Sequence, residues 1–208
     1  TDAMYRIVKD ETLELKTKAV RKPNYHGVVV SEDMLLVIDF SACHLQLYSR
    51  LDGKLLSTSH RLESRPMGVC LTSKTDVAVC LEYSSKIIIL SFKSINDIKL
   101  VKTLDVRTGF NVCDSVAKMN SSDKLVVSGW KKYDDGWMLC WGVVSITDGI
   151  LDSTHIICKV GDHSHLSIKD NTVYISCKTS DSTTNGVYAY NIFNPHTHKF
   201  LYKHQELK

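Results

Sequence analysis

Short aliphatic runs separated by polar turns continue along most of the chain, and four of these runs share one pattern. Each starts with Asp or Asn, continues with aliphatic and β-branched residues, and ends in a small or polar residue. Their apolar positions rarely show the i, i+3, i+4, i+7 spacing of an amphipathic helix, and Val, Ile, Tyr and Thr favour a pleated strand. The pattern predicts β-strands, and the four runs are DMLLVID from Asp33, DVAVCLE from Asp76, DKLVVSG from Asp123 and NTVYISC from Asn171.

The four runs recur at intervals of about 40 to 50 residues, the length of one four-stranded propeller blade. Each run has one short apolar segment before it and two after it, with polar turns between them. Asp-Gly pairs at Asp52-Gly53 and Asp148-Gly149 fall between the third and fourth segments, where Gly adopts positive φ without steric cost. The sequence therefore predicts an all-β fold, a β-propeller of about four four-stranded blades. The expected repeats cover residues 24–64, 65–107, 108–160 and 161–208, after an N-terminal strand segment at 1–23.

Asp39 ends the first of these runs and could be a catalytic carboxylate, a metal ligand or the cap of a turn. The matching positions in the other three repeats are Glu82, Gly129 and Cys177. A catalytic carboxylate is not expected to have a positional equivalent in every repeat. We therefore predict that Asp39 caps a turn.

The composition is that of a globular protein, with 208 residues, 43% hydrophobic and 24% charged. No apolar run approaches the roughly 18 residues that a membrane span needs, so we expect no membrane association. The N-terminus begins TDAMYRIVKDE and shows no basic-then-apolar leader, so nothing in these residues directs the chain to secretion. Seven cysteines without a Cys-x-x-Cys pair favour reduced thiols and a cytoplasmic location, although the sequon at Asn120 points toward secretion. A net charge of +3 is too slight to indicate nucleic acid by itself.

The stretches PNYHGVVV, LLVIDFSACHLQLYSRLDGKLL and RPMGVCL resemble an NHL-type β-propeller repeat, so the fold expected is an NHL- or WD-like propeller. The first repeat matches well and the second partly, whereas the third and fourth keep only the order of strands. Ala42-Cys43-His44 replaces the Asn-His-Arg that often precedes the third strand. The matching residues are Gly27, Val28, Leu36, Val37, Asp39, Leu45, Leu47, Asp52, Gly53, Pro66, Gly68 and Val69.

The overall pattern is similar to the C-terminal propellers of tripartite-motif proteins. That resemblance implies a recognition platform that selects a protein or RNA target, while a RING domain performs ubiquitin transfer. No Cys/His spacing of a RING or B-box occurs in these residues. The chain would then be the substrate-recognition part of a TRIM-like ubiquitin ligase, with any ligase activity outside it.

The segment SGWKKYDDGWMLCW, from Ser128 to Trp141, combines basic and aromatic residues and lengthens the third repeat. On an exposed loop, such residues suit contacts with a protein partner or stacking with RNA bases. A longer hairpin whose aromatic side chains cover its own blade is the structural alternative. Protein is preferred over RNA because the net charge is slight, and the predicted partner-binding residues are Trp130, Lys131, Lys132, Tyr133 and Trp137.

A metal-dependent propeller hydrolase of the lactonase or esterase kind is the alternative function, with Asp114 and Asp162 as inner-strand carboxylates. Four histidines in the last repeat could bind zinc, but their spacing is not diagnostic, and surface histidines explain them better. No Gly-x-Ser-x-Gly, Walker or paired-carboxylate motif occurs. We predict a non-catalytic chain without a cofactor, and the four histidines are His163, His165, His196 and His198.

Four blades are fewer than NHL-type rings generally have. An open arc would leave two apolar blade faces exposed, and large apolar patches normally find a partner. We therefore expect either self-association through these faces or missing blades that complete a larger ring. A compact four-bladed ring, closed by ETLELKT pairing with HKFLYKH, is the alternative.

Overall fold

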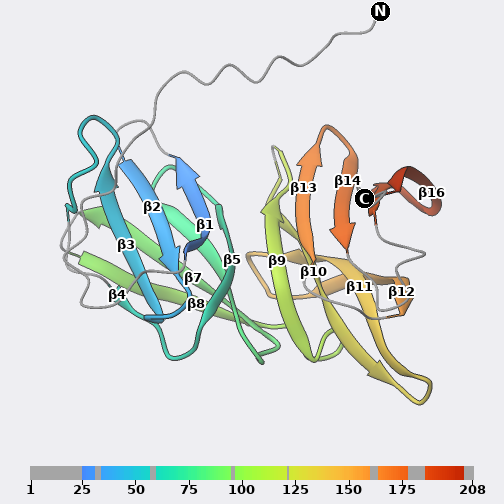
Figure 1. Cartoon of the computed structure of the whole chain (residues 1–208). Coiled ribbons are helices and arrows are strands. Elements are labelled where there is room, and N and C mark those ends of the chain that lie inside the picture. The colour runs from blue at the N-terminus through green and yellow to red at the C-terminus, as the bar shows by residue number, and fades with distance from the viewer. Residues whose placement is uncertain are drawn as a thin grey trace, which may run out of the picture.

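The computed structural model describes residues 25–30, 34–56, 60–94, 97–120, 122–159, 164–177 and 186–203, and all regular elements in these ranges are β-strands (Figure 1). No helix in the described ranges has the length and apolar character to span a membrane. The strands are β1 (Tyr25–Val30), β2 (Met34–Asp39), β3 (His44–Ser49), β4 (His60–Arg61), β5 (Pro66–Leu71), β6 (Asp76–Leu81), β7 (Lys86–Ser94), β8 (Asp97–Asp105), β9 (Val112–Lys118), β10 (Lys124–Tyr133), β11 (Gly136–Ser145), β12 (Leu151–Lys159), β13 (His165–Lys169), β14 (Thr172–Cys177), β15 (Gly186–Asn191) and β16 (Asn194–Lys203).

These strands form four antiparallel sheets of four strands each, and each sheet is a meander in chain order. We number the sheets blades 1 to 4. The first strands of the blades lie innermost, with β5 packed between β1 and β9, and β9 packed also against β13. The blades fan out from these inner strands (Figure 1). The fold is a four-bladed β-propeller, so the all-β propeller predicted from the sequence is confirmed.

Three hydrophobic cores hold neighbouring blades together, and each combines side chains from two blades. The blade 1–2 core includes Leu36, Ile38, Leu47, Val77, Leu81 and Leu90. The blade 2–3 core includes Ala78, Ile87, Leu104, Phe110, Leu125 and Val127. The blade 3–4 core includes Val126, Trp130, Trp141, Ile175, Tyr188 and Tyr190. Within the described ranges, no comparable core joins blade 4 to blade 1.

The two outer blade faces differ from the exposed apolar surfaces expected from the sequence. On blade 1, Val37 and Tyr48 point away from blade 2 because side chains alternate along a strand, yet both are buried. On blade 4, the side chains that point away from blade 3 are largely polar, and His165, Ser167 and Lys169 are exposed. The expectation of two exposed apolar faces is therefore wrong for these described residues, because one face is covered and the other is polar. The segment ETLELKT lies outside the described residues, so the predicted ring closure remains a prediction.

Glycine allows the inner strands to approach closely. A Cβ atom on Gly68 of β5 would lie 2.8 Å from Cα of Ser115 and 2.9 Å from the carbonyl oxygen of Asp114, both on β9. Real side chains essentially never approach backbone atoms this closely. Backbone therefore packs on backbone where blades 2 and 3 meet near the axis, in a region where a larger residue would push the inner strands apart.

Asp39 caps the turn that follows β2. Its carboxylate accepts a hydrogen bond from the backbone N–H of Ala42 at 3.2 Å. This contact holds the turn that reverses the chain into β3, as the sequence pattern predicts. The two Asp-Gly turns also match the sequence prediction, because Gly53 and Gly149 adopt positive φ angles of 67° and 75°.

Candidate functional site

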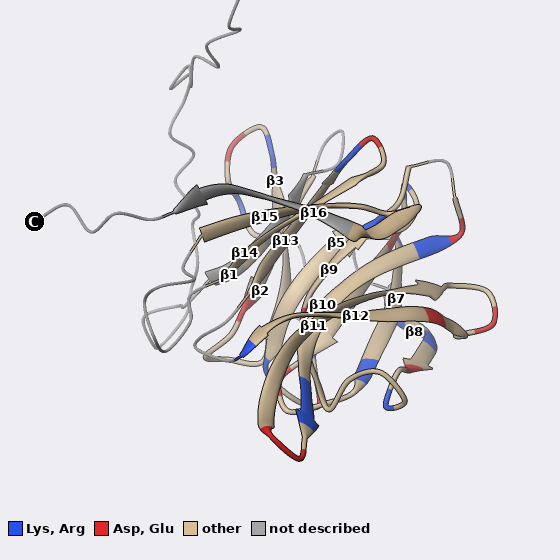
Figure 2. Ribbon diagram, turned by 90° about the vertical axis from the view of Figure 1, so that its right-hand side faces the viewer, with Lys and Arg blue, Asp and Glu red and all other residues tan. Residues whose placement is uncertain are grey.

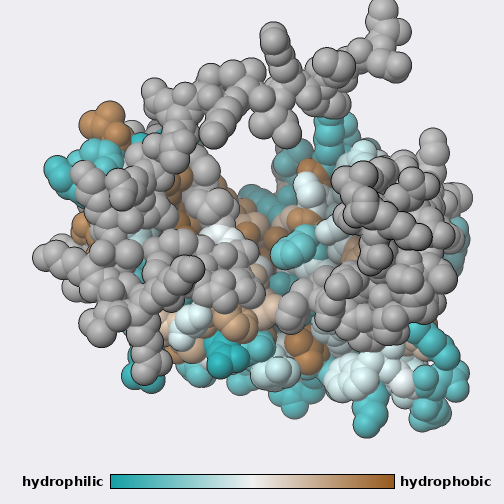
Figure 3. Space-filling view, in the orientation of Figure 1, coloured by the Kyte–Doolittle hydropathy of each residue, from teal (hydrophilic) through white to brown (hydrophobic). Residues whose placement is uncertain are grey.

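One side of the propeller is built from the connections between second and third strands and from those between successive blades. Because each blade is an antiparallel meander, these connections all lie at the same ends of the strands, on the lower side in Figure 1. We call this side the loop face. Figure 3 shows mainly hydrophilic residues along this face, with residues of intermediate hydropathy among them. Its described residues include 40–43, 62–65, 82–85, 106–111 and 131–137.

Backbone hydrogen bonds join neighbouring segments of the loop face. The loops between blades 1 and 2 and between blades 2 and 3 are each bonded to a turn or hairpin of an adjacent blade or of their own, so these described segments form one connected belt. A rigid surface of this kind loses little conformational entropy when it binds a partner. In each bond a backbone N–H donates to a backbone carbonyl. The donor and acceptor residues are Leu62 and Cys43 (2.8 Å), Glu82 and Arg65 (2.7 Å), Val106 and Ser85 (2.9 Å), and Asn111 and Trp130 (2.7 Å).

The hairpin of β10 and β11 projects furthest along this belt and carries all five predicted partner-binding residues. Its register pairs Lys132 directly with Trp137 across a two-residue turn, and Gly136 begins β11 with a φ of 115°. Lys132 is exposed, and 43% of Trp137 is accessible. These two side chains therefore lie side by side on one face of the hairpin tip.

Trp130 lies on the same face as Lys132 but deeper, inside the blade 3–4 core, where it is buried. Its indole N–H donates a hydrogen bond to the carboxylate of Asp114 at 2.5 Å. The backbone N–H of Ser164 donates to the same oxygen at 3.2 Å. Trp130 thus anchors the hairpin to its own blade and to blade 4, which is the structural alternative that the sequence left open. Its ring does not face solvent.

Lys131 and Tyr133 lie on the opposite face of the hairpin, toward blade 2. The Lys131 ammonium donates to the carbonyl of Thr108 at 2.7 Å and lies 5.7 Å from the centre of the Tyr133 ring. Tyr133 also packs against the blade 2–3 core. Both side chains are half-buried, so they brace the hairpin against loop 106–111 and leave Lys132 and Trp137 as the more accessible pair.

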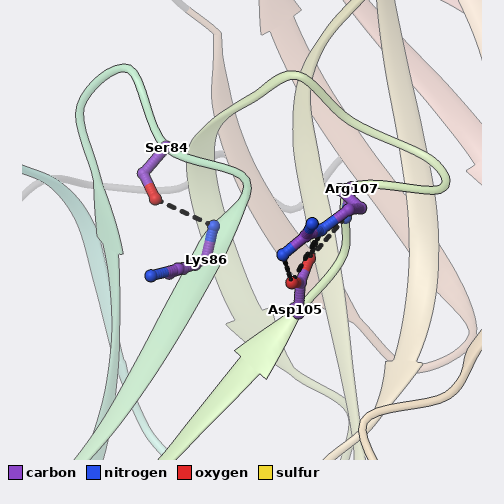
Figure 4. A network of polar contacts seen from close by, with 4 residues as sticks. All are labelled: Ser84, Lys86, Asp105 and Arg107. Carbon is purple, nitrogen blue, oxygen red and sulfur yellow. Dashed lines mark hydrogen bonds and ion pairs between the residues drawn. The ribbon is translucent and has the colours of Figure 1, made fainter.

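One charged side chain of the loop face, Arg107, is paired with the neighbouring Asp105. Arg107 donates through Nε to both carboxylate oxygens of Asp105 at 2.9 and 2.8 Å, and this guanidinium lowers the pKa of Asp105 (Figure 4). Close by, the backbone N–H of Lys86 donates to the hydroxyl of Ser84 at 3.1 Å. In Figure 2 the turns carry Lys and Arg together with Asp and Glu. Such a surface suits a protein of mixed charge better than a phosphate backbone.

The hydrolase alternative receives no geometric support from Asp114. Its carboxylate is buried and accepts the hydrogen bonds of Trp130 and Ser164, so its role is structural. Asp162 and His163 lie outside the described residues, and so does the side chain of His198. Nowhere in the described ranges do three or more His, Cys, Asp or Glu side chains converge as metal ligands.

Sequence reasoning missed an aromatic contact between β12 and the blade 3–4 core. The ring of His155 lies 4.8 Å from that of Trp141 and 6.2 Å from that of His196, and Trp141 also packs on Tyr190 at 5.6 Å. Burial lowers the pKa of His155, and the nearby His196 adds to the effect. His155 and Trp141 are cross-strand neighbours within blade 3, whereas Tyr190 and His196 belong to blade 4, so the pattern of one repeat could not indicate the whole contact.

Lowering the pH should destabilise the folded chain through His155. Its folded pKa lies below the ordinary value near 6.5, so its contribution is fully present above about pH 6.5 and is lost as the pH falls through the folded pKa. Thermal melting at pH 7.5 and pH 5.5 would measure the effect. His155→Gln should show a smaller decrease in Tm between these two values, and an equal decrease in the variant would contradict this role.

Comparison with known proteins finds no matching family for the sequence and no match among curated proteins. Solved structures do match. U3-55K shares 14% identity, with a TM-score of 0.67 over 90% of this chain and 54% of that one. The WD40 domain of Toxoplasma gondii coronin shares 10%, with a TM-score of 0.65 over 88% and 46%. The computationally designed Ika4 protein shares 15%, with a TM-score of 0.58 over 89% and 99%.

The likeness is one of fold. At these identities it shows a β-propeller with WD40 proteins among its neighbours, and it does not single out the NHL type that the sequence resembles. The chain spans about half the length of U3-55K and of the coronin domain, but nearly all of Ika4.

Proposed function

We propose that this chain is a non-catalytic interaction module that recognises a protein partner through its loop face. The observation that carries the proposal is the exposed Lys132–Trp137 pair on a hairpin that is fixed from both sides. Tryptophan is prominent among residues that dominate the energy of protein interfaces, because a large ring is desolvated at low entropic cost. Buried Trp130 and the braced Lys131 and Tyr133 supply the rigidity that such an anchor needs.

Other features of the loop face extend the proposed contact area toward blades 1 and 2. Tyr83 is 81% exposed on the turn between β6 and β7, with an unusual φ of 53°. Arg65 lies over the ring of Phe40 at 5.0 Å and pairs with Glu82 at 3.4 Å. Aromatic and Arg side chains interspersed with acidic ones favour a protein over RNA, which would require a more basic surface and freely accessible rings for stacking.

The finer proposal is that the module is the substrate-recognition part of a TRIM-like ubiquitin ligase in the cytoplasm. The NHL-like sequence features of the first repeat support it. The location is supported by the seven cysteines, none of which is paired in a disulfide bond. Ubiquitin transfer itself belongs to residues outside this chain in the proposal.

Removal of the exposed ring tests the binding role. Trp137→Ala should weaken partner binding by about 30-fold, which corresponds to about 2 kcal/mol, while stability changes little. Partners captured on the immobilised chain, with and without RNase, would be identified first and their affinities then measured by calorimetry.

Phe193→Ala is the matched control for this test. Phe193 is an aromatic residue, 75% exposed, on the turn between β15 and β16 at the opposite side of the propeller. The control should bind normally. Equal affinity of Trp137→Ala and the wild type would disprove the loop-face assignment, and capture that RNase abolishes would point to RNA instead.

A further inference from the structure

Two cysteines from neighbouring blades meet at the edge of the blade 3–4 core. Cys158 lies near the end of β12 and Cys177 is the last residue of β14, and their sulfur atoms are 3.9 Å apart. A bulge in β12 makes this possible, since Cys158 pairs with Leu139 while Ile156 pairs with the adjacent Cys140. Cys158 thereby faces blade 4 together with Leu139, whose side chain belongs to the same core.

Solvent exposure distinguishes the Cys158–Cys177 pair from a second contact between two thiols in the chain. Cys80 and Cys113 also interact through their sulfur atoms, but both residues are completely buried in the blade 2–3 core. Cys177 retains 8% exposure, and Cys158 is only half-buried. A small oxidant can therefore reach the Cys158–Cys177 pair from solvent more readily than it can reach the buried pair.

We propose that Cys158 and Cys177 form a reversible disulfide bond that ties blade 4 to blade 3 when the protein meets hydrogen peroxide. The sulfur atoms need to approach by about 1.9 Å to reach the bond length of about 2.05 Å. In the proposal, rotation of the two side chains and a small shift at the end of β14 supply this movement. The inference concerns the chain itself and does not depend on the proposed partner.

The chemistry assigns a different role to each thiol. Contact with the Cys158 thiol lowers the pKa of Cys177, and in the proposed reaction Cys177 supplies the thiolate that attacks peroxide. Its sulfur displaces hydroxide from H2O2, which takes up a proton to leave as water, and a sulfenic acid remains on Cys177. The Cys158 sulfur then attacks that sulfenic sulfur, the S–O bond breaks, and a second water leaves. In total, two thiols and one H2O2 give one disulfide and two waters, and a small thiol such as glutathione reverses the reaction.

The bond would act at the junction that holds blade 4 within the described part of the chain. Among the described residues, blade 4 is joined to the rest by the blade 3–4 core alone. A cross-link from the outer strand of blade 3 to β14 reinforces that junction. It also lies close to the loop face, because Lys159, the next residue after Cys158, pairs with Met138 beside Trp137.

Oxidation of the whole chain with hydrogen peroxide tests the proposal. After treatment, remaining thiols are blocked with iodoacetamide under denaturing conditions and the digest is analysed by mass spectrometry. The expected product is one cross-linked peptide pair containing Cys158 and Cys177, while Cys80 and Cys113 are recovered as alkylated thiols. Because the bond closes a loop of about 20 residues, the Tm should rise by about 6–12 °C, and dithiothreitol should reverse this.

Two single variants serve as controls. Cys158→Ser should show no rise in Tm on oxidation, whereas Cys80→Ser should show the wild-type rise. Recovery of Cys158 and Cys177 as separate alkylated thiols, at a peroxide dose that oxidises added glutathione, would overturn the proposal. So would a cross-link between two chains, or Cys177 oxidised to sulfinic acid without cross-link. The wild-type peptide analysis decides the question even where a variant fails to fold.

Discussion

Substituting Ala for Asp114 should lower the free energy of unfolding by about 3 kcal/mol. The carboxylate accepts hydrogen bonds from the Trp130 indole and from the backbone of Ser164, and the site is buried. Without it, two buried donors lose their acceptor, and each unsatisfied donor costs about 1–3 kcal/mol. Because the bonds link β9 to the hairpin and to the start of blade 4, the loss should also loosen the base of the hairpin.

Urea denaturation followed by tryptophan fluorescence measures this loss. Asp114→Asn keeps one oxygen acceptor in place and should restore part of the stability. Asp105→Ala removes an exposed carboxylate and should leave the midpoint unchanged. A midpoint for Asp114→Ala within error of the wild type would show that Asp114 is not a structural anchor.

Gly129→Ala should lower the free energy of unfolding by about 3 kcal/mol, about as much as Asp114→Ala. Gly129 lies in β10 where the register with β9 shifts. A Cβ atom there would overlap the carbonyl oxygen of Val112 and lie 3.0 Å from Cα of Cys113. Both are backbone atoms, which cannot rotate away, so the strand pair itself must separate.

Gly136→Ala is the comparison for this variant. A Cβ atom on Gly136 meets nothing within 4 Å, so only its positive φ opposes the substitution, at about 1 kcal/mol. The urea concentration at the midpoint of unfolding should therefore be much lower for Gly129→Ala than for Gly136→Ala. Equal midpoints would mean that the clash at Val112 relaxes without cost.

The positions of the strands were predictable from the sequence because alternation and turn chemistry are local properties. The four shared runs beginning at Asp33, Asp76, Asp123 and Asn171 correspond to β2, β6, β10 and β14, the second strands of the four blades. One local exception is the fourth strand of blade 1. There the described residues of GKLLSTSHRL provide only the bridge between Leu55 and Tyr48 and the two residues of β4.

Contacts between blades could not be predicted from the same pattern. Trp130 and Trp137 lie on one face of the hairpin, and only the position of blade 4 decides that the first is buried and the second exposed. For the same reason, the sequence predicts reduced thiols but does not predict that Cys80 and Cys113 are buried in a core. It also does not predict the approach of Cys158 to Cys177, which lie in different blades.

The three inter-blade cores make the described part of the molecule a linear series rather than a cycle. Detaching blade 4 disrupts one nearest-neighbour interface, whereas detaching blade 2 or blade 3 disrupts two. Among the described residues, the junction of blades 2 and 3 therefore lies at the centre of the series, and we expect fraying to begin at either end blade and to move inward.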